Sequence, residues 1–256
     1  MQKVSNFIST AFLELKLKSF DNKQELVLVT GSDSSHYKSL CQLLNSIKTF
    51  EKNTKTVVFD LGLTEEEQLS LEQSFDFVDL RKFDYSKYPA YFNIKSNAGE
   101  YAWKPVIVHK VLNEFKCSVC WIDAGNVITQ ELKSLRKVIE YLGFYSPFSK
   151  DTIADWTHYK SLKILEVSNN KTLLKQTNLN GACIAVNYNC ETARVVIEKW
   201  KDAALNKKVI APEGSSRDNH RQDQAILSVL AYKHIPEISK KMTFKKFGFK
   251  LHQDID

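Results

Sequence analysis

The sequence lacks the long apolar runs and the regularly spaced cysteines that would assign it to several classes of protein. No segment approaches the roughly 20 apolar residues that a membrane-spanning helix needs, and the beginning of the chain lacks the charged and compact apolar regions of a secretory signal. The five cysteines are odd in number and irregularly spaced, which argues against a disulfide framework and for a reducing compartment. We therefore expect neither a secreted nor an integral membrane protein, and we expect it in the cytoplasm.

Several functional motifs are also missing. There is no Gly-x-Ser-x-Gly elbow, no Walker loop, no arginine-rich tract and no aromatic RNA-binding signature. Cys117 and Cys120 form a Cys-x-x-Cys pair without a second pair, which favours core positions over a zinc site. An excess of 36 Lys and Arg over 30 Asp and Glu gives a net charge of +6, which favours anionic ligands but does not indicate nucleic-acid binding.

The chain has the size and apolar content of one large domain. Its 256 residues are 43% hydrophobic, and no internal repeat or Gly/Ser linker divides them. We expect a single domain over residues 25–256, preceded by a helical appendage over residues 1–24. The segment "NFISTAFLELKLKSF" mixes apolar and polar residues, so packing on the protein body and peripheral attachment to a membrane or partner both remain open.

Strand and helix patterns alternate along the first half of the domain. Buried strands are predicted at residues 25–30, 54–60, 77–83 and 117–123, and helices at 37–50, 64–75 and 100–115. Further on, the pattern predicts helices at 131–142, 191–205 and 221–233 and strands at 143–148 and 181–187. This order indicates an α/β fold with a mostly parallel sheet and helices on both of its faces.

The first predicted strand ends in a turn, "VTGSDSSHY", that suits a small ligand. A dinucleotide pyrophosphate needs further glycines here, but Ser35 and Tyr37 occupy those positions. Thr30 and Gly31 can still receive a flat base and a ribose at the carboxyl end of the strand. Asp60 ends the second predicted strand, where it either accepts hydrogen bonds from a nucleoside or forms a turn before Gly62.

A nicotinamide oxidoreductase is a rival interpretation of this turn. Tyr91 and Lys95 have the Tyr-x-x-x-Lys spacing of the short-chain dehydrogenases, but they follow Pro89 and lie well ahead of the position where that family carries its pair. Since short patterns recur by chance, we interpret this one as coincidental.

The segment "VCWIDAGNVIT" places Asp123 directly after an apolar strand. A carboxylate in that position needs a cation or hydrogen-bond donors to satisfy it. Here the sequence resembles glycosyltransferases of the GT-A fold, in which an Asp-x-Asp motif ends this strand and holds a divalent metal on the donor diphosphate. Gly125 stands where the second acidic residue belongs, so the metal site is reduced, completed elsewhere or absent. We expect Asn126, just beyond it, to contact the donor.

Later segments resemble the retaining family that includes glycogenin and bacterial lipooligosaccharide galactosyltransferases. "NLNGACIAVN" is similar to the strand that places Asn180 and Gly181 near donor sugar and acceptor in that family. "HRQDQAILSVL" is similar to its Asp-Gln segment, which implies that Asp223 and Gln224 lie beside the anomeric carbon. The matches appear in the family's order over roughly residues 25 to 252.

Two more residues gain a role from the resemblance. His252, in "FKLHQD", corresponds to a late histidine that completes the metal site, and Lys104, in "EYAWKPVIVHKVL", to a basic residue that faces the diphosphate. The resemblance thus implies a divalent cofactor, Mn²⁺ or Mg²⁺, held by Asp123 and His252, with Asp123, Asp223 and Gln224 as the catalytic residues.

The expected function is transfer of a sugar to a hydroxyl of a glycan or glycolipid. The expected donor is a nucleotide-diphosphate sugar whose nucleoside is uridine. The missing acidic residue at Gly125 leaves a nucleotide-sugar-binding protein without activity as an alternative.

Overall fold

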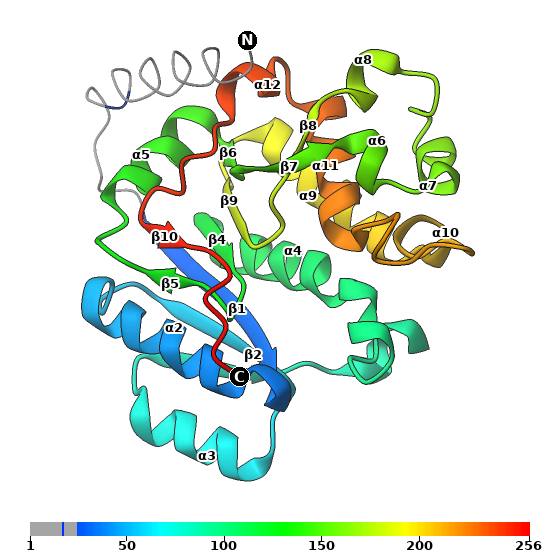
Figure 1. Ribbon diagram of the computed structural model, residues 1–256. Helices are drawn as coiled ribbons and strands as arrows, with labels where there is room; N and C mark the ends of the chain where they lie inside the picture. Colours follow the sequence, from blue (N-terminus) through cyan, green and yellow to red (C-terminus); the bar gives the residue numbers. More distant parts are fainter. Residues whose placement is uncertain (1–16, 18–24) are drawn as a thin grey trace.

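The computed structural model describes Leu17 and residues 25–256 and is built on a six-stranded sheet (Figure 1). The strands lie in the order β3-β2-β1-β4-β9-β6, in which neighbours from β3 to β4 are parallel, and β9 is antiparallel to both β4 and β6. Their bounds are β1 Leu26–Asp33, β2 Thr56–Gly62, β3 Val78–Lys82, β4 Ser118–Ile122, β6 Phe144–Tyr145 and β9 Cys183–Asn187. The predicted mostly parallel α/β sheet is confirmed.

The connections place helices on both faces of this sheet. The longer helices are α2 Tyr37–Phe50, α3 Glu65–Ser74, α4 Trp103–Phe115, α5 Lys133–Leu142, α9 Glu191–Ala204 and α11 Gln222–His234. The chain steps outward from β1 through β2 to β3 and then returns past β1 to β4. Because such crossovers are right-handed, α2 and α3 lie on one face and α4 on the other. α9 packs on α4 and α11 packs on α9, which thickens the α4 layer.

Shorter elements complete the fold around the sheet. β5 (Val127–Ile128) pairs antiparallel with β10 (Phe249–Lys250), and β7 (Phe148–Thr152) pairs antiparallel with β8 (Thr177–Leu179). The pairing of β10 brings the last part of the chain back across the body (Figure 1). The short helices are η1 Ser34–His36, η2 Tyr85–Lys87, η3 Ala90–Phe92, η4 Asn97–Tyr101, α6 Ile153–Trp156, α7 Tyr159–Ile164, α8 Lys171–Leu174, α10 Lys207–Ile210 and α12 Ile238–Lys241.

Two predicted elements differ in detail from the structure. The strand predicted at residues 143–148 is divided between β6 and β7 around Ser146 and Pro147, because proline cannot donate to a strand ladder. The helix predicted from residue 100 begins at Trp103, because residues 97–101 form a left-handed turn with φ between 47° and 62°. Pro105 is tolerated in the first turn of α4, where the backbone N–H groups have no partner within the helix.

The predicted appendage over residues 1–24 lies outside the described residues, except for Leu17. Leu17 is helical and belongs to the main hydrophobic core, with only 6% of its surface exposed. Within the described part of the chain, no helix combines the length and apolar character needed to cross a membrane.

Candidate active site

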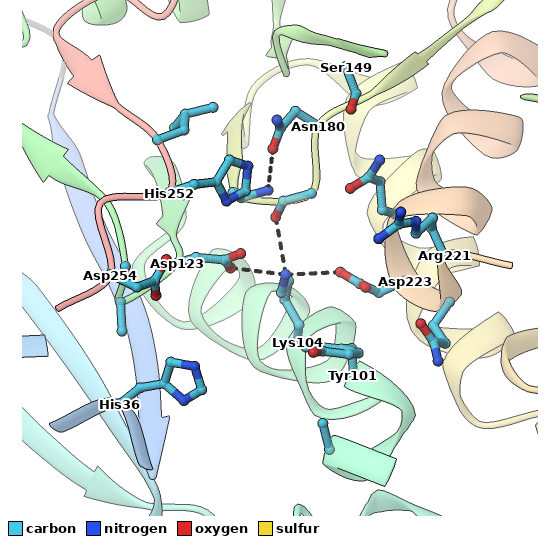
Figure 2. A pocket seen from close by; sticks show the side chains of 18 of the residues that line it. His36, Tyr101, Lys104, Asp123, Ser149, Asn180, Arg221, Asp223, His252 and Asp254 are labelled. Carbon is cyan, nitrogen blue, oxygen red and sulfur yellow. Dashed lines mark hydrogen bonds and ion pairs between the residues drawn. The ribbon is translucent and has the colours of Figure 1, made fainter. Parts of the chain in front are cut away.

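A pocket of about 910 Å³ opens at the carboxyl ends of β1 and β4. These two strands flank the point at which the strand order reverses, which is where open α/β sheets bind ligands. Residues from the β1 turn, the start of α4, the loop after β4, the start of α11 and the end of the chain line it together. Figure 2 shows side chains from these separate segments pointing toward one centre.

Lys104 occupies this centre. Its Nζ lies 3.0 Å from Oδ1 of Asp123 and 3.0 Å from Oδ2 of Asp223, on opposite sides (Figure 2). Nζ also donates to the carbonyl of Gly181 at 3.1 Å. Only 3% of the lysine is exposed, and Trp121 is among the aromatic rings that surround its ammonium group. Lys104 is therefore a buried bridge between two predicted site carboxylates, and not an exposed basic residue.

The ionisation of this cluster follows from burial and mutual attraction. Burial alone would lower the pKa of Lys104, but attraction to Asp123 and Asp223 outweighs it and raises that pKa above its ordinary value. Burial also raises the pKa of Asp223, a change that Lys104 opposes and Asp123 reinforces. Lys104 thus stays charged, and Asp223 is a stronger proton acceptor than an exposed carboxylate.

Two fully buried tryptophans hold the aspartates from behind. Nε1 of Trp121 donates to Oδ1 of Asp123 at 2.6 Å, and Nε1 of Trp200 donates to the backbone carbonyl of Asp223 at 2.8 Å. A tryptophan N–H that is buried needs such a partner. The side chain of Asp123 remains 37% exposed toward the pocket, whereas that of Asp223 is only 7% exposed.

The turn from Asn180 to Ala182 fits closely against the start of α11. Oδ1 of Asn180 accepts from the backbone N of Ala182 at 2.8 Å, which fixes the turn. A Cβ on Gly181 would lie 3.1 Å from Cβ of Gln224 and 3.3 Å from Oδ2 of Asp223. Glycine at this position therefore lets the turn approach both residues and direct its carbonyl toward Lys104.

The end of the chain forms another wall of the pocket. After β10, the backbone N of His252 donates to Oδ1 of Asn126 at 3.1 Å, and the backbone N of Gln253 donates to the carbonyl of Gly125 at 2.6 Å. The His252 side chain faces the pocket (Figure 2), and Asp254 also lines it. The tail is thus held against the loop that carries Asp123.

The structure brings most, but not all, of the predicted site residues into the pocket. Among its lining residues are Gly31, Lys104, Asp123, Asn180, Gly181, Asp223, Gln224 and His252. Thr30 does not line the pocket and is buried within β1.

Asp60 and Asn126 likewise serve the fold instead of facing the pocket. Oδ1 of Asp60 accepts from the backbone N of Gly62 at 2.8 Å and of Leu63 at 2.7 Å, which is the turn role left open by the sequence. Nδ2 of Asn126 donates to the carbonyl of Ala182 at 2.7 Å. Its Oδ1 also accepts from the tail, so this buried residue joins two walls of the site and does not itself line the pocket.

The Tyr91 and Lys95 pair lies outside the pocket. The hydroxyl of Tyr91 donates to the carbonyl of Ala204 at 2.8 Å, which uses the group that an oxidoreductase would need for catalysis. The structure therefore gives these residues no part in a nicotinamide site.

An aromatic and basic wall faces the pocket opposite the tail, and the sequence analysis did not identify it. The guanidinium of Arg221 lies 4.0 Å from the ring centre of Trp156, and that of Arg217 lies over the ring of Tyr101 and donates to its hydroxyl. Tyr101 comes from the left-handed turn before α4. In the sequence, Tyr101 lies shortly before Lys104, and Arg221 lies shortly before Asp223. This proximity to two predicted site residues is the signal that could have identified the wall.

The formal charges of the pocket nearly cancel. Five acidic side chains line it: Asp33, Asp123, Asp151, Asp223 and Asp254. Five Lys or Arg side chains line it as well: Lys104, Lys150, Arg217, Arg221 and Lys246. An anionic ligand that entered this pocket would therefore gain from an additional cation.

The donor atoms beside the tail suit a cation that arrives with a phosphate. No three His, Cys, Asp or Glu side chains of Leu17 and residues 25–256 lie together in a complete metal site. Asp123 and Asp254 nevertheless offer the oxygen ligands that Mg²⁺ and Mn²⁺ prefer, and His252 offers an imidazole. Mg²⁺ in particular is commonly bound by one or two carboxylates and substrate phosphates. The residues fit that shared mode and do not form a metal site closed by protein alone.

The fold is similar to that of GT-A glycosyltransferases, as three solved structures show. The bifunctional glycosyltransferase WbbM, in its apo form, is similar at 16% identity and a TM-score of 0.51, over 87% of this chain and 39% of that one. The galactosyltransferase LgtC, in complex with donor and acceptor sugar analogs, is similar at 13% identity and a TM-score of 0.53, over 88% of this chain and 86% of that one.

A third structure is similar, and sequence comparison adds one family. Core-mannan synthase A from Aspergillus fumigatus, in its Mn/GDP form, matches at 7% identity and a TM-score of 0.52, over 84% of this chain and 73% of that one. The family model described as "Protein of unknown function (DUF1647)" matches residues 4–109. No curated protein matches by sequence. At these identities, the structural likeness establishes the fold.

Proposed function

We propose that the protein is a glycosyltransferase that moves a sugar from a nucleotide-diphosphate donor, a uridine one, to a hydroxyl of a glycan or glycolipid. The observation that carries this proposal is the bridge from Lys104 to Asp123 and Asp223 at the switch point of a GT-A-like sheet. Such a transfer must stabilise a departing diphosphate and an oxocarbenium-like centre. The bridge sets two carboxylates on the two sides of one pocket.

In this proposal, the nucleoside enters beside the β1 turn. Gly31, Ser32 and His36 line that end of the pocket, and Leu61 adds an apolar surface suited to the face of a base. A Cβ on Gly31 would lie 3.2 Å from Cδ1 of Leu61 and 3.4 Å from the ring of Trp121, so a side chain at that position would crowd the floor of the pocket.

The diphosphate then lies between Asp123 and the tail. Asp123 and His252 would hold a divalent cation there, which would neutralise charge on the leaving diphosphate. Lys104 pairs with Asp123 and orients its carboxylate, and does not itself face open solvent. Its role as a group that directly faces the diphosphate, expected from the resemblance, becomes one of positioning the carboxylates.

Asp223 and Gln224 line the opposite side, at the sugar and acceptor. Asp223 carries a charge that can support a cationic centre or accept a proton from the acceptor hydroxyl. The Gly181 turn presses against both residues and would hold them beside the sugar. The wall of Trp156, Arg217 and Arg221 continues from there and offers a surface for the acceptor.

A panel of nucleotide sugars tests the proposal. At least one donor should raise the melting temperature of the purified protein, and the Asp123→Ala variant should bind that donor less tightly while it keeps the fold. A panel in which no nucleotide sugar stabilises the protein would contradict the proposal.

A binding protein without activity is the second candidate, and Gly125 is the observation that favours it, because the usual second acidic residue is absent. Calorimetry with a stabilising donor, alongside an assay for donor hydrolysis and transfer, separates the two. Binding without turnover supports the binding protein. If the protein were instead a nicotinamide oxidoreductase, NAD or NADP should raise its melting temperature.

A further inference from the structure

The aromatic and basic wall of the pocket, formed by Tyr101, Trp156, Arg217 and Arg221, holds two guanidinium groups over aromatic rings. The guanidinium of Arg221 lies 4.0 Å from the ring centre of Trp156, and that of Arg217 lies 5.2 Å from the ring centre of Tyr101. Contact with a ring restricts a guanidinium, while the N–H groups in its plane can still donate. Both arginines therefore present hydrogen-bond donors in a restricted orientation.

The positive charge of this wall is not used within the protein. In the described part of the chain, no ion pair joins Arg217 or Arg221 to a carboxylate, and Arg217 donates to the hydroxyl of Tyr101. The nearby carboxylate of Asp151 is engaged elsewhere, because its Oδ2 accepts from Nε1 of Trp156 at 3.1 Å. The two guanidinium groups are therefore available to a ligand with a negative charge.

The position of the wall decides where in the pocket such a charge is most favourable. Figure 2 shows Arg221 across the pocket from Asp254. Lys104 lies between them, but Asp123 and Asp223 already balance its charge. An acidic group on a ligand therefore gains most at the wall, away from the Asp254 carboxylate that lines the opposite side.

The backbone that carries the wall is strained in three separate segments. Tyr101, Asp151 and Gln222 have φ values of 53°, 62° and 35°, in the left-handed region that residues other than glycine rarely occupy. Gln222 directly follows Arg221, whose backbone N donates to the carbonyl of Trp156 at 3.0 Å. Strained residues of this kind gather at binding sites. The shared strain supports a wall that is built for a ligand.

We propose that Arg217 and Arg221 bind an acidic group of the acceptor, so that the acceptor is a glycan with a carboxylate, sulfate or phosphate near the hydroxyl that receives the sugar. This inference rests on the proposed function for the place of the acceptor. The nucleoside lies at the β1 turn and the sugar beside Asp223, so the wall lies beyond the transferred sugar. All three acidic groups accept the paired hydrogen bonds that a guanidinium donates.

The test is calorimetry of the full chain, in the presence of UDP, with three matched pairs of oligosaccharides. One pair contains a uronic acid oligosaccharide and its carboxyl-reduced form, the second a sulfated oligosaccharide and its desulfated form, and the third a phosphorylated oligosaccharide and its dephosphorylated form. In at least one pair, the acidic member should bind about tenfold or more tightly than the neutral member, since hydrogen bonds between charged groups are strong. The pair that shows this preference identifies the acidic group.

Variants of the two arginines test whether the wall causes the preference. In Arg217→Gln/Arg221→Gln, the acidic and neutral members should bind equally. Arg221→Lys keeps the charge but loses the planar fork, so it should retain only part of the preference. Arg194→Gln is the matched control, because this exposed guanidinium lies 5.0 Å from the ring centre of Tyr188, outside the pocket. The control should keep the full preference.

Equal binding, or no binding, of the two members in all three pairs would overturn the inference, as would a preference that persists in the double variant. The rise in melting temperature with UDP reports nucleotide binding separately. Loss of that rise in the double variant would assign the wall to the donor diphosphate, which overturns the inference and leaves the proposed function standing. A preference for acidic glycans that depends on the arginines, without binding of any nucleotide, would contradict the proposed function and support the acidic-glycan site.

Discussion

Lys104 is the residue on which the charge balance of the site depends, because one buried ammonium group contacts two carboxylates. Removal of one partner from a buried ion pair leaves an uncompensated charge. Lys104→Met should therefore lower the free energy of unfolding by about 3 kcal/mol, measured by urea denaturation. Combining it with Asp223→Asn, which removes the charge of the more deeply buried aspartate, should restore part of the loss. Equal stability of Lys104→Met and the unaltered protein would contradict the bridge.

Asp223 is expected to act on the sugar and acceptor, away from the nucleotide. Asp223→Asn keeps the shape of the side chain but removes the charge that supports a cationic centre or accepts a proton. Turnover should fall by about 10²-fold or more, while nucleotide affinity measured by calorimetry should persist. If nucleotide binding is lost in a variant that is still folded, Asp223 has been assigned to the wrong end of the pocket.

Among the elements, α2 and the tail depend on each other. The residue before α2, His36, provides no side-chain cap, and Asp256 instead accepts from the backbone N of Lys38 and of Ser39 and from the hydroxyl of Ser39. Asp256→Ala should therefore lower the free energy of unfolding by about 1 kcal/mol, the usual effect of losing a cap. The matched variant Asp254→Ala should leave stability nearly unchanged in the absence of metal. A reversed order of the two effects in urea denaturation would contradict the division of roles between these aspartates.

The local pattern of the elements could be predicted from the sequence, but the neighbours of the site residues could not. Short continuous apolar runs located β1, β2 and β4, and the residues at or after their ends located Gly31 and Asp123. Residues 26–32 of β1 are all buried, so the pattern could not show that Thr30 does not line the pocket. The sequence could not show that Lys104 bridges Asp123 and Asp223, because these two partners come from distant segments.

At the scale of the whole molecule, long-range contacts decide what the site contains. Asp254 reaches Gly125 only because β10 pairs with β5, and a two-residue strand in a basic tail leaves little signal in the sequence. The motif order was predictable because each motif ends a strand or begins a helix. The approach of Asp254 to Gly125 from a distant part of the chain was not.

The stability of the whole fold should depend on pH through His220. This fully buried residue donates from Nε2 to the carbonyl of Ile210 and accepts at Nδ1 from the backbone N of His158, so it is neutral in the fold. Burial lowers its pKa from 6.5 to about 4. Because the folded state binds the proton more weakly, the contribution is complete above pH 6.5 and is lost as the pH falls toward 4.

The lowered pKa of His220 corresponds to a contribution of about 3 kcal/mol to the free energy of unfolding. This contribution is measured as the decline in that free energy between pH 6.5 and about pH 4. His220→Gln should show a smaller decline, whereas the control His36→Gln, at an exposed position, should retain it. The same decline in all three proteins would assign the pH dependence to other groups.

The central claim is that the Lys104 bridge serves transfer of a sugar from a nucleotide-diphosphate donor, and the most direct test is release of nucleoside diphosphate from such donors. The purified protein, supplied with Mn²⁺ and a panel of nucleotide sugars, should release the nucleoside diphosphate from at least one uridine donor as the sugar passes to an acceptor sugar or to water. Asp223→Asn should release it about 10²-fold more slowly. Release from no donor in the panel, or release at the same rate by both proteins, would contradict the account.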